Sequence, residues 1–199
     1  MGPLLRAASE SIAAEGPAIG LIEVQSIARG ITVADAMVKR AAVRLVLNRP
    51  VSPGKHLSLC TGDVGDVEEA MTAGLARAGS SLCDQLMLSQ VHAEVLRALG
   101  STERSTLDEA LSIGILETFS AAAVLLGADA ACKATDVHLY EIRLCDGLGG
   151  KGFAIFSGEQ DLVEAALATA QEKLNPGLYL GHELIARPHP DLIESLLRN

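Results

Sequence analysis

The side chains that could carry chemistry are few, and their spacing favours no active site. No two histidines stand four residues apart, the spacing that places two imidazoles on one helix face for a zinc ion. No two cysteines show the C-x-x-C spacing of zinc and redox sites. We therefore expect no metal site. The residues concerned are His56, His92, His138, His182 and His189, with Cys60, Cys83, Cys132 and Cys145.

Two further motifs invite a catalytic interpretation. Gly150-Lys151 resembles the end of a phosphate-binding loop, but that motif needs Ser or Thr next and then a helix, whereas Gly152 and a predicted strand follow here. Glu23 and Glu117 could act as an acid–base pair, yet no histidine stands at a useful spacing from either. Each is predicted to hold a structural position in or just after a strand. Since no nucleophile, base and orienting group can be assembled, we expect no enzyme.

The composition excludes two classes of partner. The chain has 199 residues, with 16 Lys plus Arg and 25 Asp plus Glu, and a formal net charge of −9. We expect no nucleic-acid binding, because neutralising phosphates supplies most of that affinity. No apolar run approaches the roughly 20 residues of a membrane-spanning helix, and no secretory signal is recognised, so we expect no membrane contact. The scattered cysteines favour a reduced, cytoplasmic protein.

The dominant feature of the sequence is a tandem repeat. Residues 19–23 recur at 113–117, an offset of 94, and Lys39 recurs as Lys133 at the same offset. The matches keep their order to the end of the chain, where His92 meets His189 at an offset of 97. Loop insertions explain this drift. The chain therefore arose by duplication of one unit.

The duplication predicts the domain organisation. We expect an N-terminal extension over residues 1–17 and a first domain over 18–99. A polar, turn-forming linker over 100–111 should precede a second domain over 112–199.

Each copy predicts the same succession of elements. Apolar alternation predicts strands, and apolar residues at helical spacing predict helices. In the first copy the strands are expected at 18–24, 43–47, 56–60 and 82–88, and the helices at 32–42, 63–78 and 93–99. Thr32 is the expected cap of the first helix. The order β-α-β-β-α-β-α predicts an α+β fold of the ferredoxin-like type, not circularly permuted, with helices packed on an antiparallel sheet.

Five short motifs occur in order, and parts of several recur in the other copy. They are Gly-Leu-Ile-Glu at 20–23, Ala-Asp-Ala-Met-Val-Lys at 34–39, Pro-Gly-Lys at 53–55, Gly-Asp-Val at 62–64 and Arg-Pro-His at 187–189. Together they resemble the bacterial microcompartment shell domain. Two fused, unpermuted copies are similar to the single-layer, tandem-domain class of the propanediol-utilisation type. This resemblance implies a structural shell protein whose homotrimers form pseudohexagonal discs and tile into facets with other shell proteins.

The loop between the second and third strands of each copy has two interpretations. From the residues alone it is a tight turn built on Pro and Gly. The resemblance implies that both loops line a central pore for small metabolites. The implied pore residues are Ser52, Pro53 and Gly54 in the first copy and Leu148, Gly149 and Gly150 in the second. Ser52 and Leu148 align, so a hydroxyl would alternate with an apolar side chain around the rim.

The pore position also bears on cofactors. Some relatives of this class carry a cysteine at the position of Ser52 and hold an iron–sulfur cluster on the ring axis. A serine is a far poorer ligand than the thiolates that such clusters require. We therefore expect no cofactor.

Four residues are implied to lie at the disc edge, where discs meet. They are Lys39, Lys133, Arg187 and His189. From the residues alone, each lysine is a solvated side chain favoured by the dipole at a helix C-terminus. The first copy lacks the Arg-Pro-His pattern, so the disc edges formed by the two copies should differ in how strongly they bind the next disc.

Two alternative functions stay open. Ferredoxin-like trimers can bind ligands between subunits, which would make this protein a small-molecule-binding regulator. An electron-transfer shell protein is the other alternative, and Ser52 argues against it.

Overall fold

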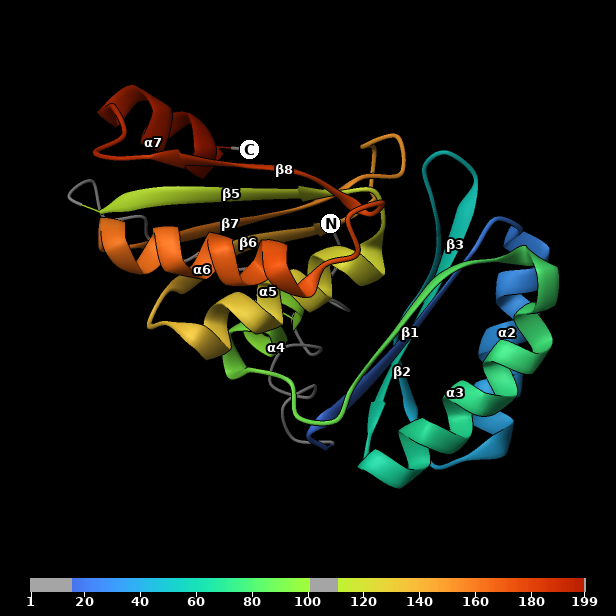
Figure 1. Ribbon diagram of the computed structural model, residues 1–199. Coiled ribbons are helices and arrows are strands. Elements are labelled where there is room, and N and C mark those ends of the chain that lie inside the picture. Colours follow the sequence, from blue (N-terminus) through green and yellow to red (C-terminus); the bar gives the residue numbers. More distant parts are fainter. Residues whose placement is uncertain (1–15, 101–110, 199) are drawn as a thin grey trace.

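The computed structural model describes residues 16–100 and 111–198, which form two copies of one α+β unit (Figure 1). Each copy has the predicted order of strands and helices. The predicted N-terminal extension and linker fall mostly on residues 1–15 and 101–110, which lie outside the described residues.

Apart from one short 3-10 helix in the first copy, the elements of the two copies correspond one to one. The first copy consists of β1 (Ala18–Val24), α2 (Ile27–Arg40), β2 (Arg44–Val51), β3 (Lys55–Gly62), α3 (Val64–Ala78), the short 3-10 helix η1 (Gly79–Ser81), β4 (Leu82–Leu88) and α4 (Ala93–Gly100). The second copy consists of β5 (Ser112–Thr118), α5 (Ala121–Ala134), β6 (His138–Leu144), β7 (Gly152–Gly158), α6 (Gln160–Lys173), β8 (Tyr179–Ile185) and α7 (Pro190–Arg198).

Each copy builds one four-stranded antiparallel sheet. The strand order is β2-β3-β1-β4 in the first sheet and β6-β7-β5-β8 in the second. This confirms the unpermuted ferredoxin-like plan. The register shift between the first and last strands of a copy also recurs, after Glu23 in the first sheet and after Glu117 in the second. The duplication therefore extends to local backbone irregularities.

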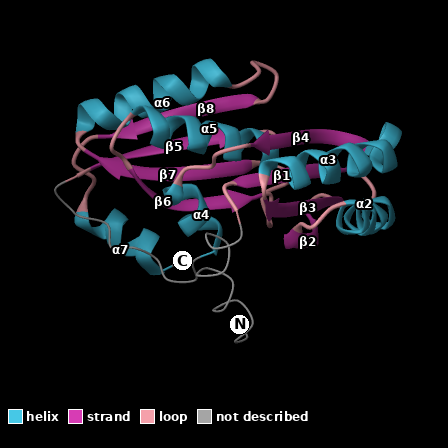
Figure 2. Cartoon of the chain, turned by 90° about the horizontal axis from the view of Figure 1, so that it is seen from below, coloured by secondary structure: helices cyan, strands magenta, loops and turns pink. Residues whose placement is uncertain are grey.

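The helices and sheets alternate in layers. In Figure 1, α2 and α3 cover one face of the first sheet, and α5 lies between the two sheets. Helix α5 therefore packs on its own sheet and also against β1 and β4 of the first copy. One apolar cluster runs through both copies, from Leu21 and Leu59 to Leu125 and Phe156. Figure 2 shows α4 of the first copy close to β6 of the second. Burial of apolar surface thus joins the two copies.

The first helix begins earlier than predicted. Thr32 was the expected cap, but α2 begins at Ile27, and the hydroxyl oxygen of Ser26 accepts a backbone N–H of the first turn at 3.3 Å. The predicted start was wrong because Gly30 is a poor helix former and interrupts the pattern. Ser120 caps α5 in the same way.

One packing site exchanges its large and small residues between the copies. In the first copy Gly30 of α2 faces His56 of β3, and a Cβ on Gly30 would lie 2.3 Å from the imidazole ring. The equivalent positions of the second copy hold Val124 on α5 and Gly152 on β7, where a Cβ on Gly152 would lie 2.6 Å from Cγ1 of Val124. Nε2 of His56 lies 2.7 Å from Oδ1 of Asn48. Burial lowers the pKa of His56.

Candidate functional site

The two predicted pore loops lie side by side (Figure 1). Residues 52–54 join β2 to β3, and residues 145–151 join β6 to β7. Gly54 and Gly150 have φ angles of 101° and 91°, which glycine adopts without strain. A Cβ on Gly150 would stand 3.1 Å from Cδ of Pro53, so the two backbones approach closely. The hairpins of both copies therefore meet at one end of the contact between the copies.

A buried carboxylate anchors the second copy beside these loops. The side chain of Glu23 is fully buried in β1. Its Oε1 lies 2.5 Å from Nζ of Lys55, and its Oε2 accepts the backbone N–H of Ala121 at 2.9 Å. That N–H belongs to the first turn of α5, where the helix dipole favours an anion. Next to it, the hydroxyl of Ser120 donates to Asp84. We call Glu23, Lys55, Asp84, Ser120 and Ala121 the internal seam.

The charges of the internal seam support each other. Burial alone would lower the pKa of Lys55, but the hydrogen bond and negative charge of Glu23 outweigh it and raise that pKa above the ordinary lysine value. Lys55 therefore stays protonated at neutral pH and balances the buried carboxylate.

A second polar cluster joins α4 to β6. Oε2 of Glu94 accepts the backbone N–H of Leu139 at 2.9 Å and lies 2.8 Å from Nδ1 of His138. Arg97 bonds Glu94 and the carbonyl oxygen of Leu139. Burial alone would raise the pKa of Glu94, but the bonds from Arg97 and Leu139 outweigh it and lower that pKa. The sequence did not predict this cluster or the pairing of Asp84 with Ser120. Both join residues that are more than 30 positions apart in the sequence, so only the folded chain brings them together.

The two predicted edge lysines lie at equivalent helix ends but have different partners. Lys39 is 73% exposed and bonds Asp35 of its own helix at 2.7 Å. Lys133 is 45% exposed and bonds both Asp129 and the carbonyl oxygen of Gln90, each at 2.5 Å. Gln90 belongs to the first copy, so Lys133 also supports the contact between the copies.

The structure does not bring the other two predicted edge residues onto Lys133. Arg187 is exposed and follows β8 with a φ of 54°. His189 is exposed and its Nδ1 accepts the backbone N–H of Asp191 at 3.2 Å. Both residues lie at the far end of the second copy, at the positions equivalent to Gln90 and His92 of the first.

An open cavity of about 800 Å³ lies beside Lys133 between the two copies. The first copy contributes His92 and Glu94 to its lining, and the second contributes Cys132 and His138. A cavity of this size can hold a small polar molecule.

Three of the four cysteines are buried, including Cys145 at the start of the second loop. Burial raises the pKa of Cys60 to about 11 and that of Cys132 to about 12. Burial also raises the pKa of Cys145 to about 12, and its Sγ donates to the carbonyl oxygen of Gly150. Cys83 lies on β4, an outer strand of the first sheet, and is exposed. With Ser52 in the first loop, the residues present do not fit an iron–sulfur cluster.

In residues 16–100 and 111–198, no group of three His, Cys, Asp or Glu side chains is placed to hold a metal ion. No helix in the same part of the chain is long and apolar enough to cross a membrane.

The fold and the repeated loops agree with a known family. The sequence matches the BMC domain over residues 18–91 and again over 112–188, so the chain belongs to the BMC family of microcompartment shell proteins, with two domains in tandem. It is 38% identical over 176 residues to the bacterial microcompartment shell protein PduT of Citrobacter freundii, covering 88% of this chain and 95% of PduT. It is also 38% identical over 86 residues to the carboxysome shell protein CsoS1C of Halothiobacillus neapolitanus, which is 42% of this chain and 88% of CsoS1C.

Solved structures show the same relationship. A microcompartment protein from Desulfitobacterium hafniense DCB is 41% identical, with a TM-score of 0.78, over 89% of this chain and 98% of that one. The fused permuted hexameric shell protein MSM0275 from the RMM microcompartment shares the fold at 21% identity and a TM-score of 0.63, over 87% of this chain and 91% of that one.

Proposed function

We propose that this protein is a structural tile of a bacterial microcompartment shell. Three chains close into a pseudohexagonal ring, rings join edge to edge with each other and with other shell proteins, and the ring centre passes small metabolites. The tile acts without catalysis. The observation that carries the proposal is the meeting of the two hairpin loops, with Gly150 against Pro53. A cyclic assembly of three such chains brings every copy of both loops to one axis.

The rim of this pore would alternate in chemistry. Ser52 presents a hydroxyl and Leu148 an apolar side chain at aligned positions of the two loops. Around them, Gly54, Gly149 and Gly150 keep side-chain volume low and leave backbone N–H groups available to a passing anion. Arg49 forms an ion pair with Asp146, which ties the first copy to the loop of the second. The pore therefore suits small polar metabolites.

Reversing the charge of the two edge lysines is expected to abolish sheets. In the proposed facet Lys39 and Lys133 pack against the equivalent lysines of the next ring. The variant Lys39→Asp, Lys133→Asp changes the charge of both residues at every such contact, which should prevent the rings from joining. Negative-stain electron microscopy over a concentration series should show discs that merge into sheets for the natural protein and discs alone for the variant.

The matched control is Lys173→Asp. Lys173 is an exposed lysine in the last turn of α6 and has no edge role in the proposal. Because Lys133 also bonds Gln90, the single variant Lys39→Asp separates tiling from the contact between the copies. Sheets that persist in both Lys39 variants would contradict the edge assignment.

The cavity beside Lys133 favours a second candidate, a regulator that binds a small molecule between the copies. The same micrographs distinguish the two functions. Particles that never associate at any concentration would favour the regulator, and thermal-shift screening of metabolites would then be the next measurement.

A further inference from the structure

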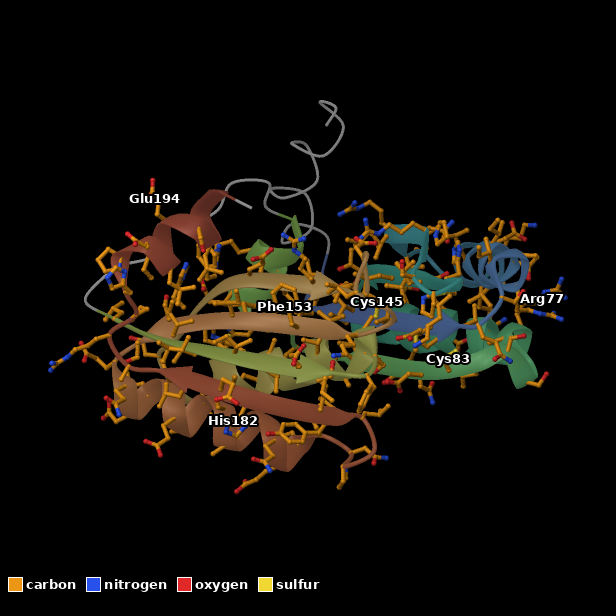
Figure 3. The ribbon with its side chains drawn as sticks, turned by 90° about the horizontal axis from the view of Figure 1, so that it is seen from above. Arg77, Cys83, Cys145, Phe153, His182 and Glu194 are labelled. Carbon is orange, nitrogen blue, oxygen red and sulfur yellow. The ribbon has the colours of Figure 1, made fainter. Side chains whose placement is uncertain are left out.

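Two arginines of the first copy lie together at one end of its helix pair. Arg29 belongs to the first turn of α2 and Arg77 to the last turn of α3, and both are exposed. The start of α2 and the end of α3 lie side by side (Figure 1). Figure 3 shows Arg77 at the end of the first copy that is farthest from the second copy. Both guanidinium groups therefore reach the same stretch of open surface.

The two arginine side chains cross between the helices around one hydroxyl. Nη1 of Arg29 donates to the backbone carbonyl oxygen of Arg77 at 3.4 Å. Nε of Arg77 donates to Oγ1 of Thr32 at 3.2 Å. The hydroxyl of Thr32 in turn donates to the carbonyl oxygen of Arg29 at 2.9 Å. This closed set of hydrogen bonds holds both guanidinium groups beside Thr32. We call Arg29, Thr32 and Arg77 the arginine cluster.

Most of the hydrogen-bonding capacity of the arginine cluster is unused. A guanidinium group has five N–H donors, and carboxylates and phosphates are its strongest partners. Within residues 16–100 and 111–198, Arg29 and Arg77 each use one side-chain N–H, and each bonds a neutral oxygen. Two neighbouring arginines without a carboxylate are unusual in a chain of net charge −9. Other cations of this chain do pair with a carboxylate, namely Lys39, Arg40, Arg49, Lys55, Arg97, Lys133 and Arg143.

The second copy packs the same pair of helices without this cluster. The position equivalent to Arg29 is Ala123, at the offset of 94, so one of the two guanidinium groups is absent. The end of α6 carries Lys173 where the end of α3 carries Arg77. Helices α5 and α6 nevertheless pack together as α2 and α3 do. The arginine cluster is therefore a feature of the first copy that the packing of the unit does not require.

We propose that the arginine cluster binds a phosphate group, as the dianion of a small phosphate monoester. Such a group carries a charge of about −2 and presents three acceptor oxygens, which matches two guanidinium groups and their free donors. A carboxylate has one charge and two oxygens, which a single arginine satisfies. The cluster lies at the same end of the first copy as the hairpin loop 52–54 (Figure 1), so the bound molecule is held at the end that carries a proposed pore loop. Binding itself does not depend on the proposed ring.

Isothermal titration calorimetry with inorganic phosphate tests the site. The titration is run at about pH 8, where phosphate is mainly a dianion, and at low ionic strength, because salt screens exposed charges. The natural protein should bind one phosphate per chain. Arg29→Gln and Arg77→Gln should each weaken the affinity at least about 10-fold, the effect of losing a charge-assisted hydrogen bond. Far-UV circular dichroism checks that the variants fold.

The matched control is Arg40→Gln. Arg40 lies on the same helix as Arg29, is exposed, and already pairs with Glu69. Its substitution changes the net charge equally and leaves the cluster intact, so the phosphate affinity should stay within about 2-fold of the natural value. Thr32→Val keeps both charges and removes the hydroxyl that positions Arg77. It should cause a smaller loss of affinity than either arginine variant.

Two further ligands identify the class of molecule. Methyl phosphate should bind about as tightly as inorganic phosphate, because the cluster is exposed and the ester oxygen can face solvent. Failure of methyl phosphate to bind would overturn the monoester and assign the site to free phosphate. Acetate should bind at least about 10-fold more weakly, since it carries one charge instead of two. Acetate that binds as tightly as phosphate would overturn the assignment to a dianion.

The outcomes separate this inference from the proposed function. A protein that forms rings and binds no phosphate would overturn the inference and leave the ring in place. The same holds if Arg29→Gln and Arg77→Gln bind phosphate as tightly as Arg40→Gln does. A protein that binds phosphate through both arginines but sediments as single chains at every concentration would support the inference and overturn the ring.

Discussion

Truncation of Glu23 to Ala is expected to lower the free energy of unfolding by about 3–5 kcal/mol, the usual cost of removing one partner of a buried ion pair. The substitution leaves the Lys55 ammonium without its carboxylate and leaves the first N–H of α5, at Ala121, without an acceptor. The measurement is urea unfolding followed by circular dichroism, at a protein concentration where sedimentation shows single chains.

The same truncation in the second copy is the control. Glu117→Ala removes an equivalent carboxylate that is 46% exposed, so single chains should lose at most about 1 kcal/mol. Equal losses for the two variants would contradict a special role for the internal seam.

The pH dependence of the Glu23 effect has a definite sign. The pKa of Lys55 in the folded state lies above the ordinary value of 10.5. The ion pair therefore contributes fully below pH 10.5 and is lost as the pH rises through the raised pKa. The difference in unfolding free energy between the natural protein and Glu23→Ala should be constant near neutral pH and decrease only in strongly alkaline solution.

The second large effect is expected where Gly30 meets His56. Gly30→Val alone would press a branched side chain against the imidazole ring and should destabilise the protein by about 3 kcal/mol. His56→Gly alone leaves a cavity and removes the partner of Asn48, at a cost of about 2–4 kcal/mol. The double variant recreates the pair that Val124 and Gly152 form in the second copy, so its cost should fall short of the sum by about 2 kcal/mol.

A double-mutant cycle in urea measures this coupling. Strictly additive costs would show that the two residues do not share one packing space. The cycle needs no outside reference structure, because the second copy of the same chain shows how the exchanged pair packs.

Much of the fold follows from local pattern and from the repeat. The strands Ala18–Val24 and Leu82–Leu88 were predicted with their observed bounds. Each is a short segment rich in apolar residues that lies between residues typical of turns. The predicted start of α2 at Thr32 was too late because Gly30 interrupts the helical pattern, but the second copy of the repeat indicates the observed start. Ser120 and the uninterrupted alanines after it mark the start of α5, and the offset of 94 transfers that start to Ser26.

The seam could not be predicted in the same way. Glu23 was expected to hold a structural position, and it lies in β1. Its partners, Lys55 and Ala121, are 32 and 98 residues away in sequence, so only the packed structure brings them together.

The covalent connection across the internal seam would change the kinetics with which the proposed ring forms. Six separate domains would have to find one another in many bimolecular steps, whereas half of the contacts in a ring of three chains form within a chain, at an effective concentration of the order of millimolar. Their formation does not depend on dilution. Ring formation is then at most third order in protein, so rings should persist at concentrations where an unfused relative with contacts of the same strength would dissociate. When they do dissociate, the fragments released are whole chains with Glu23 still covered.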